Sequence, residues 1–342
     1  METEQTREYG TVPTRRHRAV ADRAFRWVTL AAGLGLVVML GLLLWVLGEG
    51  GWRAIREFGL HFLIGRDWNP VAGRESYGAL PFIFGTAVTS AVAMMLAVPI
   101  GVGVALLLNE ISSGWVRNPL AVLVDLLAAI PSVVYGLWGL YVLVPIFDRD
   151  VEPALESTVG RIPVVGDLFR GAGNGGDLLT AGVVLAVMIL PIVTAVSREV
   201  IAIVPGDLRE ASLALGATRY EAVRMAVLPY ARPGIVGASM LGLGRALGET
   251  IAVALVVGNQ PRVGASLLQG GYTIPAVIAN EFREATSVGL HRSALLFLAL
   301  VLVAMALAMA TVSRLLVRHT ARLVGGAVEV RDEAAVTTMG MA

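Results

Sequence analysis

Two ionisable residues stand inside an otherwise apolar stretch of the sequence. The segment "GLGRALGET", residues 242–250, places Arg245 and Glu249 within Gly234–Gly258, a run long enough to cross a bilayer. A charged side chain at the centre of a membrane helix costs about 2.5 to 3.5 kcal/mol. Ionisable residues in membrane spans therefore indicate function, and a guanidinium is well suited to oxyanions. We predict that Arg245 lines an anion pathway and that Glu249 holds it in place. The alternative is an internal Arg–Glu pair that packs a subunit interface.

The residues around this pair divide into a small face and a bulky face. Positions four apart lie on one face of a helix, so we expect Arg245 and Glu249 to share a face. Small residues dominate that face, which includes Ala238, Leu241, Gly242, Gly248 and Ala252. Bulky residues dominate the opposite face, which includes Val236, Met240, Leu243, Leu247 and Ile251. We expect the bulky face to contact lipid and the small face to contact another helix or a narrow cavity.

Few other residues are candidates for chemistry. Asp125 lies in a second apolar run, six residues before Pro131, and either belongs to the pathway or sits near the membrane surface. The chain contains no cysteine and no lysine, and its four histidines are scattered. The phosphate-binding loop GxxxxGK[ST] needs its lysine, so any ATP must be bound by a separate chain. We expect no catalytic site, metal or cofactor in this chain.

The composition indicates an all-α integral membrane protein. Of 342 residues, 56% are hydrophobic and 15% are charged, and the mean hydropathy is +0.73. A bilayer core of about 30 Å needs about 20 apolar residues as helix. The predicted spans are Val28–Leu47, Ala79–Leu108, Leu120–Phe147, Leu178–Val204, Gly234–Gly258 and Ser293–Val317. Pro99, Pro131 and Pro191 interrupt three of the six and are candidates for kinks. The net charge of +1 gives no reason to expect nucleic acid as a partner.

The placement of arginine predicts the orientation. With both termini inside, the inner segments carry 16 arginines and the outer segments 10. This bias follows the positive-inside rule. We expect a basic cytoplasmic tail over 1–27, a permease domain over 28–320 and a flexible cytoplasmic tail over 321–342. All-arginine usage suggests a bacterium with GC-rich codons, which predicts the bacterial cell membrane as the location.

The coupling segment, residues 205–232, lies between the fourth and fifth predicted spans. Asp207 and Glu210, and again Thr218 and Glu221, have the spacing of a capping box. Gly216 stands between them as a glycine that ends a helix would. We therefore predict two short helices joined at Gly216 and followed by Pro229. Few exposed basic residues argue against a DNA-binding helix-turn-helix, and docking of a cytoplasmic partner fits better.

This segment resembles the EAA motif of ABC importer permeases. Glu210, Ala211, Gly216, Leu228 and Pro229 are in register with that motif, whereas Ser212 and Ala226 depart from it. Longer stretches, among them "ARPGIVGASMLGLGRALGETIAVALVVGN" (231–259), resemble the permease subunits of phosphate ABC importers. The resemblance covers about residues 28–320 and is to PstC-type subunits more than to PstA-type ones.

The resemblance implies a MetI-like permease fold and a set of partners. These are a second, PstA-like permease subunit, a dimer of PstB-like ATPases and a PstS-like phosphate-binding protein outside the membrane. It also implies that Arg245 and Glu249 act in phosphate passage and that the coupling segment docks on the ATPase. The resemblance implies inorganic phosphate as the substrate and membrane lipids around the permease.

Two other functions remain open from the sequence. In the first, the chain would be a permease for another oxyanion, such as molybdate or sulfate. In the second, it would mainly be a scaffold for phosphate signalling. The resemblance around Arg245 favours phosphate, and the coupling segment argues against an autonomous channel.

Overall fold

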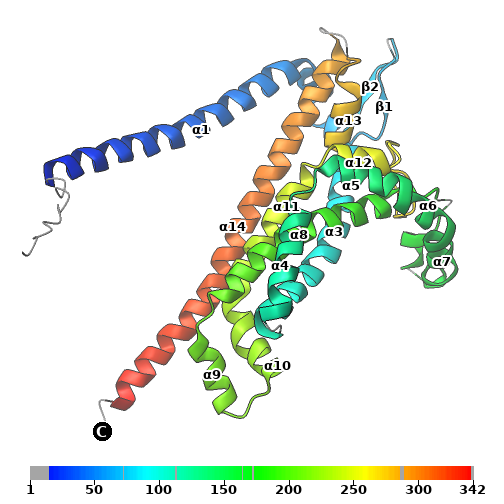
Figure 1. Cartoon of the computed structure of the whole chain (residues 1–342). Coiled ribbons are helices and arrows are strands. Elements are labelled where there is room, and N and C mark those ends of the chain that lie inside the picture. The colour runs from blue at the N-terminus through cyan, green and yellow to red at the C-terminus, as the bar shows by residue number, and fades with distance from the viewer. Residues whose placement is uncertain are drawn as a thin grey trace, which may run out of the picture.

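The computed structural model describes the backbone of residues 15–71, 73–111, 114–163, 165–171, 173–285 and 289–339. Side chains are described between residues 23 and 318 of these ranges, apart from residue 111. Within this part the chain is almost wholly helical, with one short hairpin (Figure 1). The predicted all-α class is confirmed.

Among the described residues, four helices are long and apolar enough to cross a membrane. They are α1 (Arg15–Phe58), α3 (Leu80–Leu106), α8 (Leu178–Ala202) and α14 (Leu290–Met339). Helix α3 continues into a π-helical turn, η1 (Leu107–Ile111). These four helices coincide with the predicted spans at Val28–Leu47, Ala79–Leu108, Leu178–Val204 and Ser293–Val317.

The two remaining predicted spans are broken in the middle. The chain bends by 92° between α4 (Gly114–Ala128) and α5 (Ser132–Trp138), at Pro131. The other break separates α11 (Leu228–Leu247) from α12 (Ile251–Val256). Counting the α4–α5 pair as one gives up to five spans, so the predicted six are not confirmed. Proline cannot donate a backbone hydrogen bond, which explains the first break.

The rest of the third predicted span stays helical after α5. It passes through η2 (Gly139–Leu143), α6 (Val144–Ile146) and η3 (Phe147–Val151) into α7 (Glu152–Ser157). Two 3₁₀ turns follow, η4 (Val159–Arg161) and η5 (Gly166–Phe169). Asp177 then caps α8, because its carboxylate accepts a hydrogen bond from the Thr180 N–H at 2.7 Å.

Helix α8 is the centre of the bundle. It packs against α3, α11, α4 and α12, and its apolar side forms the main core with residues such as Leu185 and Ile189. By contrast, α1 packs mainly against α14 and extends away from the bundle (Figure 1). All the long apolar side chains of α1 between Phe25 and Val46 are therefore at least partly exposed in the single chain.

The two ends of the bundle carry different structures. One end holds α2 (His61–Ile64), the hairpin of β1 (Trp68–Asn69) and β2 (Ser76–Tyr77), and α13 (Ile274–Glu281). The Glu281 carboxylate joins them, since it accepts a 2.9 Å hydrogen bond from Trp68 and lies 2.9 Å from His291 at the start of α14. The opposite end holds the coupling segment (Figure 1).

The half-helices α5 and α12 pack against each other without room for a side chain at Gly136. A Cβ atom there would lie 2.7 Å from the Ala252 Cα and 2.8 Å from a Leu255 methyl carbon. The contact holds together the halves that follow each break.

Gly136→Leu is expected to destabilise the bundle, because overpacking of a closed interface costs about 1 to 3 kcal/mol. Gly103→Ala is the matched control, since a Cβ on this α3 glycine would meet nothing within 4 Å. Thermal unfolding of the purified chain in detergent measures both. Equal melting temperatures for Gly136→Leu and wild type would contradict the close contact.

Candidate functional site

Arg245 lies in the last turn of α11 and its side chain is exposed. Within the part of the chain that the structure describes, its guanidinium makes no hydrogen bond and no ion pair. It lies within electrostatic range of the Tyr135 hydroxyl on α5. That hydroxyl donates a 2.7 Å hydrogen bond to the Leu127 carbonyl, across the Pro131 break. Arg245 thus lies beside the broken part of the bundle with an exposed side chain.

The Arg245 face of α11 consists of Leu241, Gly244, Arg245 and Gly248. Leu241 is 57% exposed, and a Cβ added at Gly244 would meet nothing within 4 Å. Apart from Leu241, the residues beside Arg245 on this face are glycines. The face is therefore open to a partner or to water.

Part of the predicted bulky face is buried, which corrects the expectation that the whole face contacts lipid; Val236 and Met240 are half-buried and Ile251, after the break, is exposed. Leu243 and Leu247 are only 8% and 5% exposed. Helix α11 packs against α8, α14 and α3, so Leu243 and Leu247 face protein. Gly242, expected beside Arg245, is also buried, and a Cβ there would lie 2.9 Å from a Val193 methyl carbon of α8.

Glu249 does not share the helical face of Arg245. Helix α11 ends at Leu247, and Glu249 lies in the break before α12. Its carboxylate accepts a 3.3 Å hydrogen bond from the Ala252 N–H and so caps α12. Among the described residues no ion pair joins it to Arg245. The predicted pairing is therefore not found, because the helix that would align the two residues stops between them.

Asp125 lies on α4, with a side chain that is 56% exposed. Its carboxylate is 3.8 Å from the Arg198 guanidinium near the end of α8. This contact links α4 to α8 rather than to Arg245. A pathway role for Asp125 stays a prediction.

The coupling segment forms the helix–turn–helix that its sequence predicts. Helix α9 (Gly206–Ala214) and α10 (Arg219–Ala222) are joined through Gly216, whose φ of +87° suits glycine. Thr218 and Glu221 make the predicted capping box, and the hydrogen bonds from Thr218 lower the pKa of Glu221. Asp207 does not cap α9, because that helix begins at Gly206 and places Asp207 within its first turn.

Pro229 does not end the second helix. Helix α10 passes through a π-helical turn, η6 (Val223–Val227), directly into α11. A wider turn accommodates a proline that has no N–H to donate. Residues 219–247 are thus one continuous helical rod, about 43 Å long at 1.5 Å per residue.

The surface of the coupling segment is partly apolar. Glu210, Ala211 and Gly216 are exposed. Leu215 and Tyr220 are 90% and 71% exposed around the Gly216 turn. Exposed apolar residues gathered on one turn are typical of a protein contact.

The sequence of residues 97–325 matches the family of binding-protein-dependent transport system inner membrane components. That match covers more than half of the chain. The chain belongs to this family of permeases.

Curated relatives narrow the similarity. The permease is 44% identical over 298 residues to the phosphate transport system permease protein PstC of Pasteurella multocida, covering 87% of this chain and 92% of that protein. It is 40% identical over 278 residues to PstC 2 of Mycobacterium tuberculosis, covering 80% and 86%. A solved inward-facing MetNI methionine ABC transporter is 19% identical with a TM-score of 0.50, over 70% of this chain and 94% of the other. The last likeness concerns the fold alone, and it confirms the MetI-like permease fold.

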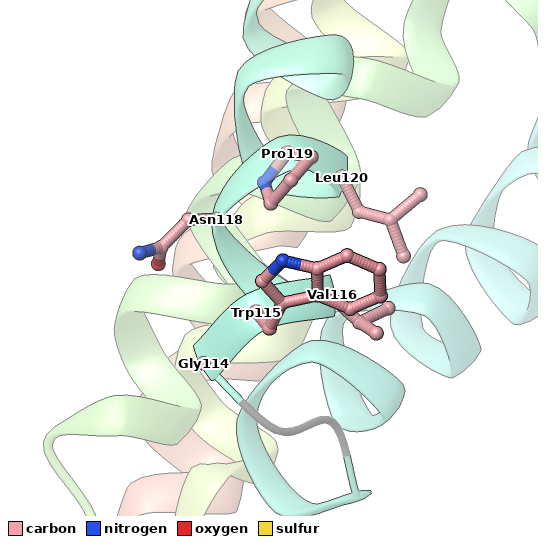
Figure 2. A pocket seen from close by; sticks show the side chains of 6 residues that line it. All are labelled: Gly114, Trp115, Val116, Asn118, Pro119 and Leu120. Carbon is pink, nitrogen blue, oxygen red and sulfur yellow. The ribbon is translucent and has the colours of Figure 1, made fainter.

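A hollow of about 550 Å³ opens at the start of α4 (Figure 2). Its lining residues are Gly114, Trp115, Val116, Asn118, Pro119 and Leu120. Figure 2 shows Asn118 pointing to the opposite side from Leu120. The described residues that line the hollow include no charged side chain, and Trp115 is 89% exposed. An exposed tryptophan beside apolar residues is typical of a membrane interface and unsuited to an anion.

One polar cluster of the permease is invisible to sequence reasoning. Glu110 on η1 and Arg209 on α9 form a 2.7 Å ion pair. They are 99 residues apart, so no local spacing could have indicated the contact.

Glu249→Gln is expected to keep the melting temperature of the purified permease, because the amide oxygen can still accept from the Ala252 N–H. Glu249→Ala removes the cap and is expected to cost about 1 kcal/mol. Thermal unfolding in detergent compares the two variants. An unchanged melting temperature for Glu249→Ala would contradict the capping role.

Proposed function

We propose that this chain is a permease subunit of an ATP-driven, binding-protein-dependent importer of inorganic phosphate. One observation carries the proposal: among the described residues, the exposed Arg245 near the end of α11 has no hydrogen bond and no ion pair, and Gly244 and Gly248 lie beside it on the exposed surface. The curated relatives carry the name phosphate transport system permease, which favours phosphate among the oxyanions. The membrane is then the bacterial cell membrane.

The physical argument for a pathway starts from the cost of the charge. Arg245 facing hydrocarbon would cost about 2.5 to 3.5 kcal/mol on insertion scales. A second permease subunit that covers the Arg245 face and leaves a water-filled gap removes that cost. The N–H donors of the planar Arg245 guanidinium would then face the gap, where two of them can bind one phosphate in bidentate geometry.

Glu249 has a role in this proposal that differs from a fixed partner of Arg245. Its carboxylate caps α12 beside the break, and its negative charge lies close to the proposed pathway in sequence and space. We propose that this charge limits how tightly phosphate is held, so that the anion passes on.

The coupling segment is where ATP hydrolysis would drive the proposed transport. The chain has no lysine for a phosphate-binding loop, so we propose that ATP is bound and hydrolysed by a separate ATPase dimer. The exposed turn around Gly216 would dock on that ATPase, which places this end of the bundle and both termini in the cytoplasm. A binding protein would deliver phosphate at the hairpin end.

Arg245→Gln is expected to lower ATP-dependent uptake of labelled phosphate at least tenfold, since the amide has neither the charge nor the fork. Arg161→Gln, an exposed arginine outside α11, is the matched control and should keep uptake. Vesicles containing this permease, its second subunit, the ATPase and the binding protein provide the measurement. Full uptake by Arg245→Gln would reject the pathway role. Uptake abolished by excess molybdate or sulfate would assign another oxyanion, and a changed gene response with intact uptake would assign a signalling scaffold.

Gly248→Cys is expected to react with a water-soluble thiol reagent in the assembled transporter and to be protected by phosphate. Ala246→Cys is the control, because Ala246 is buried at 4% exposure against the bundle. The chain has no cysteine of its own, so each signal reports a single site. Absence of reaction at Gly248→Cys would mean that the Arg245 face packs dry against the partner.

A further inference from the structure

The coupling helix α9 is tied to the bundle by one arginine. The Arg209 Nε lies 3.1 Å from both carboxylate oxygens of Glu110, and its Nη2 lies 2.7 Å from one of them. The two side chains are only 26% and 12% exposed. A guanidinium that engages a carboxylate through two nitrogens is fixed in direction as well as in distance.

The same guanidinium also caps α8. Its Nη1 donates a 2.7 Å hydrogen bond to the Val204 carbonyl, and its Nη2 donates a 3.1 Å hydrogen bond to the Ile201 carbonyl. Carbonyls at a helix C-terminus lack partners within the helix and carry partial negative charge. Arg209 therefore joins three elements at one point: α9, the end of α8 and the η1 turn that continues α3.

The η1 turn has a second attachment to α8 beside this point. The Asn109 amide donates a 2.6 Å hydrogen bond to the Arg198 carbonyl and accepts one of 3.0 Å from Arg117 on α4. A π-helical turn here widens the helix just where Asn109 and Glu110 turn towards their partners.

Apolar contacts alone do not fix α9. No residue of α9 is buried, although Leu208 packs partly against a cluster of Ala105, Ile201, Val204, Val227 and Ala231. That cluster belongs to α3, the end of α8, η6 and α11, and would hold those elements together without Arg209. The polar contacts of Arg209 therefore give α9 a directional attachment to the bundle, whereas the apolar cluster packs the other elements without involving Arg209.

We propose that Glu110 and Arg209 are positioning residues that transmit a displacement of α9 to α3 and α8. This inference rests on the proposed function, in which an ATPase moves the coupling segment. Without the pair, α9 would move with the ATPase while α3 and α8 stay behind. Loss of the pair would then uncouple ATP hydrolysis from transport. The permease would still fold and the ATPase would still hydrolyse ATP.

The first experiment measures phosphate imported per ATP hydrolysed in vesicles that contain the complete transporter. Glu110→Gln and Arg209→Gln are each expected to lower this ratio at least fivefold while hydrolysis continues. The double variant is expected to be no worse than the more impaired single variant, because both remove one shared interaction. Arg209→Lys keeps the charge without the fork, and its ratio is expected to lie between those of Arg209→Gln and wild type.

The matched control is a short ion pair outside the coupling end. Arg170 and Asp167 lie 3.0 Å apart with side chains that are 56% and 63% exposed, and Asp167→Asn should keep the wild-type ratio. A wild-type ratio in both Glu110→Gln and Arg209→Lys would overturn the inference. So would single-variant losses that multiply in the double variant, since the residues would then act separately.

A second readout does not depend on the identity of the substrate. In the Gly248→Cys background, thiol reactivity should differ between nucleotide-free and ATP-bound transporter, and Glu110→Gln should abolish that difference. A persistent nucleotide response in Glu110→Gln would overturn the inference. A normal response in Gly248→Cys, together with no phosphate uptake by the transporter with wild-type Gly248, would instead contradict the proposed substrate.

Discussion

A guanidinium without an ion-pair partner cannot face hydrocarbon cheaply, and this constraint governs the arrangement around Arg245. Helix α11 buries Leu243, Leu247 and several small residues against α8 and its neighbours, and leaves Arg245 exposed beside Leu241, Gly244 and Gly248. In the proposal, the single chain therefore lacks the surface that covers its Arg245 face in the membrane. If the proposed location in the membrane holds, polar surface or water completes the Arg245 face, and the second permease subunit proposed above would supply both.

The cost of exposing polar groups to hydrocarbon also applies to the backbone at the two broken helices. Non-helical backbone within a membrane is tolerated only where protein buries it or where it lines an aqueous cavity. Both breaks, at Pro131 and after Leu247, lie next to half-helices that contact each other at Gly136. Tyr135 spans the first break through its hydrogen bond to Leu127, and Glu249 satisfies an N–H at the second. Two unrelated interruptions of the sequence thus converge on the neighbourhood of Arg245.

The parts of this structure that sequence could predict are those set by local pattern. Long apolar runs predict α3, α8 and α14, and the Thr218–Glu221 spacing predicts its capping box. Pro99 and Pro191 remain inside helices, whereas Pro131 marks a 92° bend. The same residue type gives different outcomes because neighbouring helices decide whether a freed carbonyl can be accommodated. The capping role of Glu249 and the Glu110–Arg209 contact depend on where helices end in space, which no spacing rule contains.

Two mechanical routes connect the coupling segment with Arg245. The first is the continuous rod of residues 219–247, which begins just after the Gly216 turn and carries Arg245 in its last turn. The second runs from α9 through Arg209 and Glu110 into α3 and α8, the helices against which that rod packs. A movement along one route alone would shear α11 against α8, where Gly242 and Val193 already leave no spare room. In the proposed mechanism, displacement of the coupling segment would therefore carry both routes together, and the Arg245 face would open or close as a unit.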